Sequence, residues 1–90
     1  MILRQSTQFK KDLKRFKNKP SKIKDLKAVL KDLKNLGRVS NSHFPHKLSG
    51  NYKGHMECHI GSDYLLIWID ESEQIIKLVR LGTHAELFGK

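Results

Sequence analysis

The sequence predicts an α+β fold with the element order β-α-α-β-β-β, in which two helices pack on one face of an antiparallel sheet. Between residues 7 and 36, apolar side chains recur at spacings of three and four, the periodicity of amphipathic helices. Residues 52–82 instead alternate between apolar and polar or run continuously apolar, as strands do. Because helices and strands occupy separate runs, the pattern favours an α+β fold. The whole chain, residues 1–90, is expected to form a single domain.

Two amphipathic helices are expected in the first part of the chain. Ser6 or Thr7 can cap the first helix, and residues 18–20 should break it before Ser21 caps the second. Gly37 is expected to end the second helix, because glycine adopts the left-handed conformation that often follows a last turn. The apolar faces are predicted to carry Phe9, Leu13 and Phe16 on the first helix and Ile23, Leu26, Val29, Leu30, Leu33 and Leu36 on the second.

The predicted strands cover residues 2–4, 52–60, 64–70 and 75–82. Gly61 and Ser62 should form the turn between the second and third of them, and residues 85–88 a short terminal helix or turn. Residues 38–47 are expected to be a polar loop.

Side chains of residues 52–60 are predicted to alternate between the two faces of the sheet. The inward set is Tyr52, Gly54, Met56, Cys58 and Ile60, and the outward set is Lys53, His55, Glu57 and His59. An inward Cys58 should be chemically inert.

Positive charge is concentrated in the helical half of the chain. Residues 1–38 hold 13 Lys and Arg against 3 Asp, a balance of +10, whereas residues 39–90 hold 5 against 6 Asp and Glu, a balance of −1. This asymmetry predicts a polyanionic partner, either nucleic acid or an acidic protein. A lysine-rich helix face that merely keeps the protein soluble is the alternative, and charge alone does not separate the two.

The sequence contains no signal for export or for a membrane. There is one cysteine, so no disulfide can form within the chain, and no run approaches the roughly 18 apolar residues of a membrane span. No secretory leader pattern opens the sequence. We therefore expect a cytoplasmic protein with no membrane partner.

Five histidines raise the possibility of a metal site. His55 and His59 are four residues apart, which on a strand separates them by roughly 13 Å, too far to share one ion. No cysteine pair accompanies His43 and His46 in the preceding loop. We expect no metal and no cofactor.

A second group of polar residues favours metal-free RNA cleavage. Histidine can move protons near neutral pH, arginine can bind a phosphate bidentately, and an aromatic ring can stack on an unpaired base. The C-terminal stretch supplies one of each in Arg80, His84 and Phe88. Arg80 lies in an apolar strand, so it requires an anion, which is either an internal carboxylate or a ligand phosphate.

Three motifs together resemble the YafQ-type branch of the RelE/ParE superfamily of toxins. They are HKLSG at residues 46–50, ECHI at 57–60 followed by Asp63, and VRLGTHAELF at 79–88. The resemblance implies a RelE-like, microbial-ribonuclease-type fold and the toxin of a type II toxin–antitoxin module. It also implies a metal-independent endoribonuclease that cuts mRNA in the decoding site of the 30S ribosomal subunit. A cognate antitoxin would neutralise it, with a heterotetramer as the usual assembly.

Nine residues are candidates for the site, and the resemblance carries over to six of them, which are His46, His59, Asp63, Arg80, His84 and Phe88. The catalytic set is His46, His59, Asp63, Arg80 and His84, and the RNA-binding set is Lys47, Lys53, Tyr64 and Phe88. His84 would protonate the leaving 5′-oxygen, and Arg80 would hold the scissile phosphate. Either His46 or His59 would activate the 2′-hydroxyl, and the sequence leaves that choice open. Met56 stands where many relatives carry arginine, which removes one phosphate contact.

The alternative function is a ParE-like toxin that inhibits DNA gyrase by binding, without cutting RNA. That branch shares the fold but lacks this set of histidines, so the sequence favours the nuclease. A plain nucleic-acid-binding module would explain the basic helices but not Arg80 and His84.

Overall fold

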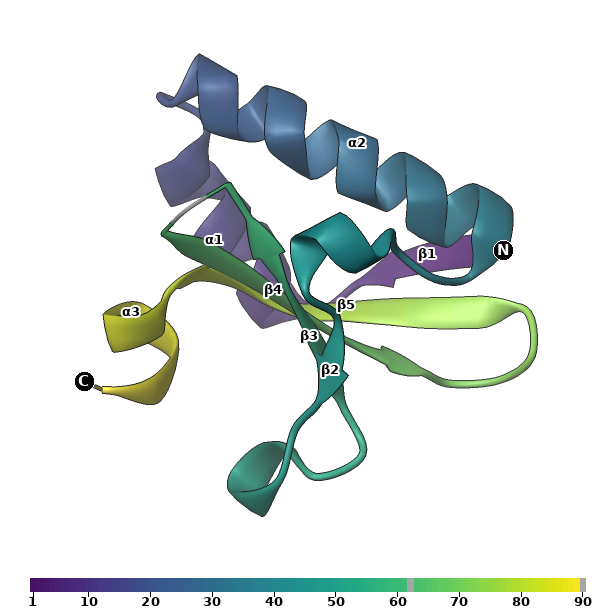
Figure 1. The fold of residues 1–90 in the computed structure, drawn as a ribbon. Helices are drawn as coiled ribbons and strands as arrows, with labels where there is room; N and C mark the ends of the chain where they lie inside the picture. Colours follow the sequence, from purple (N-terminus) through teal and green to yellow (C-terminus); the bar gives the residue numbers. More distant parts are fainter. Residues whose placement is uncertain (62, 90) are drawn as a thin grey trace.

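The computed structural model, which describes residues 1–61 and 63–89, is a five-stranded sheet with two long helices on one face (Figure 1). The sheet order is β1-β5-β4-β3-β2. Its elements are β1 (Ile2–Gln5), α1 (Thr7–Phe16), α2 (Pro20–Leu36), β2 (His46–Lys47), β3 (Met56–Ile60), β4 (Tyr64–Asp70), β5 (Ile75–Thr83) and α3 (His84–Phe88). The predicted fold class and element order are confirmed, with β2 as an additional short strand inside the predicted loop.

The sheet is mixed, so the prediction of a wholly antiparallel sheet was wrong. Strands β2 to β5 are antiparallel to their neighbours, but β1 pairs parallel with β5, with Ile2 opposite Ile75. Only a hairpin forces two strands to be antiparallel, and almost the whole chain separates β1 from β5.

One hydrophobic core lies between the helices and the sheet. Phe9 and Phe16 of α1 and the buried face of α2 pack against inward side chains of β3, β4 and β5. The strand residues in this core are Cys58, Ile60, Tyr64, Leu66, Trp68, Ile76, Leu78 and Leu81. The inward assignment of Cys58 and Ile60 is confirmed, since neither is exposed.

The helix ends follow the predicted chemistry with two corrections. The Ser6 hydroxyl accepts the N–H of Phe9 at 2.9 Å, which confirms the first cap, and Gly37 ends α2 with a φ of 72°. Ser21 was predicted to cap α2, but the helix begins at Pro20 with Lys19 at the N-cap position, so Ser21 lies within the first turn, where the missing N–H of Pro20 costs nothing. Leu36 was predicted on the apolar face, yet it is 64% exposed.

The opposite face of the sheet carries a smaller apolar cluster. Leu65 and Ile67 of β4 pack there with Leu87 of α3, and Leu48, Tyr52, Val79 and Phe88 surround them. The assignment of Tyr52 to the inward set was wrong, because residues 50–52 form a 3₁₀ turn in place of the expected strand. This cluster supports the polar residues described below.

Of the described segments, no helix is long and apolar enough to cross a membrane.

Cys58 should resist thiol reagents in the folded protein. Its side chain is buried, and burial raises the pKa of the thiol to about 12, so the reactive thiolate is scarce at neutral pH. We expect labelling by a disulfide reagent at pH 8 to be slow in buffer and complete in denaturant. Rapid labelling of the native protein would contradict the strand register.

Candidate active site

The cross-strand register places four residues in one row on the face opposite α1 and α2. His46 lies opposite Glu57, Glu57 opposite Ile67, and Ile67 opposite Arg80. Residues directly opposite one another project from the same face. Neighbouring strands lie about 4.8 Å apart, so the backbone positions of His46 and Arg80 are about 14 Å apart. His46 and Arg80 therefore stand at the two ends of one row on the same face.

A second row brings His59 to the same face. His59 lies opposite Leu65, and Leu65 lies opposite Gly82, which has no side chain. The chain then turns from β5 into α3. His84 and Phe88 follow β5 directly, so they stand at the end of this row.

The start of α3 is fixed by a capping box. The Thr83 hydroxyl accepts the N–H of Glu86 at 3.1 Å, and the Glu86 carboxylate accepts the N–H of Thr83 at 2.7 Å. His84 is the first residue of the helix and is exposed. Its ring lies 5.0 Å from that of Phe88, measured between centroids. The capping box thus holds a proton carrier and an aromatic ring side by side.

Gly82 is required for the close approach of α3 to β5. A Cβ at this position would lie 2.9 Å from the Glu86 carboxylate oxygen Oε1 and 3.3 Å from Cδ2 of Leu87. We expect Gly82→Ala to displace Glu86 from the capping box and to lower RNA cleavage about tenfold, because His84 moves with α3. Single-turnover cleavage by the variant, with its circular dichroism spectrum as the folding control, measures this. Cleavage by Gly82→Ala at the wild-type rate would show that the displacement of Glu86 does not disturb His84.

His46 is held through both ring nitrogens. Nδ1 lies 3.0 Å from the Phe44 carbonyl, and Nε2 lies 3.0 Å from Oε1 of Glu57. Glu57 is buried, and its other oxygen, Oε2, has no hydrogen-bond partner among the described residues. The His59 ring lies edge-on to Phe44, with centroids 5.5 Å apart. The site therefore offers two histidines in different surroundings for proton transfer.

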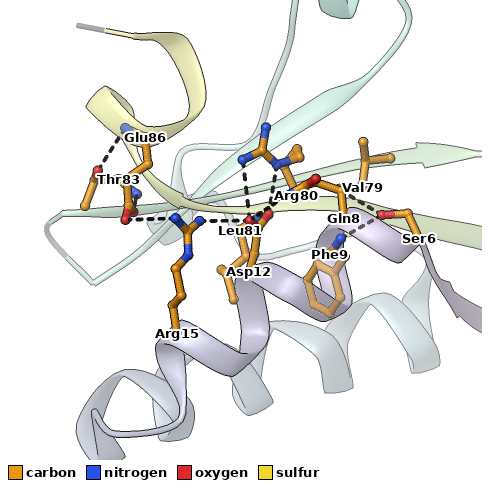
Figure 2. A network of polar contacts seen from close by, with 10 residues as sticks. All are labelled: Ser6, Gln8, Phe9, Asp12, Arg15, Val79, Arg80, Leu81, Thr83 and Glu86. Carbon is orange, nitrogen blue, oxygen red and sulfur yellow. Dashed lines mark hydrogen bonds and ion pairs between the residues drawn. The ribbon is translucent and has the colours of Figure 1, made fainter.

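Arg80 pairs with Asp12, a buried carboxylate of α1 (Figure 2). Arg80 Nε donates to Oδ2 at 2.8 Å, and the backbone N–H of Leu81 donates to the same oxygen at 2.9 Å. The hydrogen bond to Asp12, followed by one with Tyr52, raises the pKa of Arg80. Burial alone would raise the pKa of Asp12, but the bonds from Arg80 and Leu81 outweigh it, so that pKa is lowered.

Sequence reasoning missed Asp12, although the sequence contained a signal for it. Asp12 lies three residues after Phe9 and four before Phe16, so it occupies the apolar stripe of an otherwise basic helix. An acid at such a position requires a buried partner. Tyr52 was also missed: its ring contacts that of Phe88, with centroids 5.9 Å apart.

Asp12 should make the stability of the fold sensitive to acid. A carboxylate with a lowered folded pKa stabilises the protein above its unfolded pKa of about 3.9, and this contribution disappears as the pH falls through the folded value. Asp12→Asn is expected to cost about 2 kcal/mol at pH 7 and progressively less below about pH 4. Urea unfolding of both proteins across this pH range measures the difference. A difference in the free energy of unfolding that does not change with pH would contradict this prediction.

Four predicted residues lie apart from the rows described above. Tyr64 is buried in the helix-side core, with its ring 4.7 Å from that of Phe16, and its hydroxyl is bonded by Lys19. Lys47 lies opposite Met56, on the helix side of the register. Lys53 and Asp63 are exposed in turns. The predicted turn residue Ser62 lies outside the described residues.

Across residues 1–61 and 63–89, no three histidine, cysteine or acidic side chains are grouped in a way that could hold a metal ion.

Comparison with known proteins identifies similar chains over nearly the whole length. Residues 1–89 match the family described as the bacterial toxin of the type II toxin–antitoxin system, YafQ. The mRNA interferase toxin YafQ of Escherichia coli (strain K12) is 31% identical over 85 residues, covering 93% of this chain and 91% of that protein.

Two solved structures show the same architecture. A chain in the crystal structure of the E. coli DinJ–YafQ complex superposes with a TM-score of 0.84 at 30% identity, covering 97% of each chain. A metal-bound toxin from Helicobacter pylori superposes with a TM-score of 0.83 at 34% identity, covering 98% of this chain and 99% of the other.

Proposed function

This chain belongs to the YafQ family of type II toxin–antitoxin toxins, and on that basis we propose that it is an endoribonuclease that cuts mRNA on the ribosome. The observation that best supports this activity is the common placement of Arg80, His84, His46 and His59 on one sheet face and its adjoining helix. This set provides a phosphate ligand between groups able to move protons.

The proposed reaction is an internal transfer at phosphorus. A histidine removes the proton of the 2′-hydroxyl, and the 2′-oxygen attacks the neighbouring phosphorus. The bond from phosphorus to the 5′-oxygen then breaks, and a second group protonates that oxygen. The products are a 2′,3′-cyclic phosphate and a 5′-hydroxyl, so neither a metal nor an oxidant is consumed.

The roles of His84 and Arg80 rest on their surroundings, and the other roles are those expected from the sequence. His84 is exposed at the start of α3 and protonates the 5′-oxygen, while Arg80 stabilises the charge on the phosphate oxygens. His46 or His59 accepts the 2′ proton, and Asp63 orients this end of the site. Phe88 stacks on a base, with Lys47 and Lys53 contacting the RNA backbone. The burial of Tyr64 favours a packing role for that ring over stacking on RNA.

The basic helices supply the contact with the ribosome. Lysines of α1 and α2 such as Lys10, Lys14, Lys24, Lys27 and Lys31 are exposed. We propose that they bind ribosomal RNA phosphates near the 30S decoding site, in which case affinity falls steeply with salt. Binding to ribosomes that does not change between roughly 50 and 300 mM salt would exclude this contact.

A cognate antitoxin is the second proposed partner. A related toxin was solved in the DinJ–YafQ complex, and a net charge of +9 suits an acidic protein segment. We propose a heterotetramer of two toxins and two antitoxins, in which the antitoxin covers the basic surface or the site.

The test is the chemistry of the RNA ends after induced expression. Transcript mapping should find new ends at a restricted set of codons, with a 5′-hydroxyl on one fragment and a cyclic phosphate on the other. Purified protein should make the same cuts in mRNA bound to ribosomes. Growth arrest with DNA damage and intact transcripts would instead support the gyrase-inhibiting alternative.

A further inference from the structure

Arg80 is ion-paired inside the protein and is also the proposed phosphate ligand. We propose that Asp12 is a positioning residue, which holds the guanidinium of Arg80 by its Nε edge and thereby presents the remaining donors to the RNA phosphate. The proposal rests on the proposed function only in taking Arg80 as the phosphate ligand.

The geometry of the pair leaves Arg80 with free donors. Nε lies 2.8 Å from Oδ2 of Asp12, and Nη2 lies 3.4 Å from Oδ1. A guanidinium has five N–H groups, so these two contacts and the hydrogen bond with Tyr52 leave two. Nη1 points away from Asp12 (Figure 2). A phosphate can therefore bind the outer edge of the guanidinium while the ion pair stays intact.

The ion pair has a buried end and a partly exposed end. Arg15, one turn further along α1, donates to Oδ1 of Asp12 at 2.9 Å, so one carboxylate is shared by two cations. Nη1 of Arg15 also lies 3.7 Å from Oε2 of Glu86, so Asp12 is not the only carboxylate that balances these two cations. The Asp12 side chain is fully buried, whereas the Arg80 side chain is 20% exposed. Asp12, which holds the guanidinium, thus lies inside the protein, and the edge of Arg80 proposed to bind phosphate faces outward.

The backbone around Asp12 is fixed, which gives the carboxylate a defined position. β1 pairs with β5 only as far as Leu78, and beyond that point side chains of α1 and its cap bond the open edge of β5. The Ser6 hydroxyl donates to the Val79 carbonyl at 2.9 Å, and Asp12 accepts the Leu81 N–H at 2.9 Å (Figure 2). Since Asp12 holds the backbone on one side of Arg80 and the side chain of Arg80 itself, a shift of the carboxylate moves the phosphate ligand.

The test is a double-mutant cycle on cleavage of ribosome-bound mRNA under single-turnover conditions. Asp12→Asn keeps the shape and an oxygen that can accept the Leu81 N–H, but it lacks the charge and the second acceptor. We expect the cleavage rate at saturating protein to fall about 10- to 100-fold, with the concentration for half-maximal rate little changed. In an Arg80→Lys background, Asp12→Asn should cause almost no further loss, because its effect acts through Arg80. Asp32→Asn, the same change on α2, should cleave like the wild type.

A spectroscopic measurement separates positioning from general stabilisation. The Nε–H of Arg80 should give a slowly exchanging side-chain NMR signal in the wild type that is lost in Asp12→Asn, at a temperature where both proteins are fully folded. Full cleavage by Asp12→Asn, or equal losses from Asp12→Asn in the wild-type and Arg80→Lys backgrounds, would overturn the proposal. If the Arg80→Lys protein cleaves at the wild-type rate, or the wild type does not cleave, the proposed function fails instead.

Discussion

His84→Ala should abolish cleavage of ribosome-bound mRNA while leaving the fold intact. The side chain is exposed at the first position of α3, and its ring contacts only that of Phe88 among the ring pairs of the described chain. Its loss therefore costs little stability, whereas loss of a general acid typically costs about 10²- to 10⁴-fold in rate. Single-turnover cleavage and growth after induced expression measure the two consequences.

Two further variants show whether the loss at His84 is a loss of proton transfer. His84→Gln keeps a polar side chain of similar reach but cannot donate a proton in the same way, and it should be as inactive as the alanine variant. His55→Ala removes a histidine whose Nδ1 lies near the carbonyls of Tyr52 and Lys53 in its own turn, and it should remain active. Appreciable cleavage by the glutamine variant would assign the proton to another group.

Arg80→Ala should lower both cleavage and stability, and the two effects should separate in Arg80→Lys. The alanine variant removes the proposed phosphate ligand and leaves Asp12 with Arg15 as its remaining cationic partner. We expect a rate loss of about 10²- to 10³-fold and a fall of about 2 kcal/mol in the free energy of unfolding. Lysine keeps the charge but lacks the planar fork.

Arg80→Lys is therefore expected to recover most of the stability and little of the rate. Urea unfolding and single-turnover cleavage on the same preparations measure both quantities. If lysine restored the rate in proportion to the stability, Arg80 would act only as a structural ion pair, and the phosphate contact would have to come from another residue.

Local periodicity in the sequence was sufficient to predict most of the fold. The spacing of apolar residues identified α1 and α2, and the alternation in residues 56–60 assigned Cys58 and Ile60 to the core. What failed depended on long-range pairing or on irregular turns. Neither the sequence around Ile2 nor that around Ile75 indicates that the two strands pair in parallel. The 3₁₀ turn that redirects Tyr52 has no periodic pattern of apolar residues by which it could be predicted.

In the candidate site, too, local features were predictable from the sequence and long-range contacts were not. Arg80, His84 and Phe88 lie close together in the sequence, so their proximity was predictable. Asp12 lies 68 residues from Arg80, and the pairing of Glu57 with His46 requires the short strand β2 that the sequence did not indicate. The sequence showed that Arg80 required an anion, and only the three-dimensional arrangement identified its partner as a carboxylate of α1.

The parallel pairing of β1 with β5 has a consequence for synthesis of the protein. A ribosome releases β1 before β5, yet β1 finds its hydrogen-bonding partner only in residues 75–78. Asp12 likewise cannot form its hydrogen bonds to Arg80 and Leu81 until those residues have been synthesised. The sheet and the candidate site therefore form together, once β5 has left the ribosome. Until then α1 lacks the strand against which it packs in the folded protein.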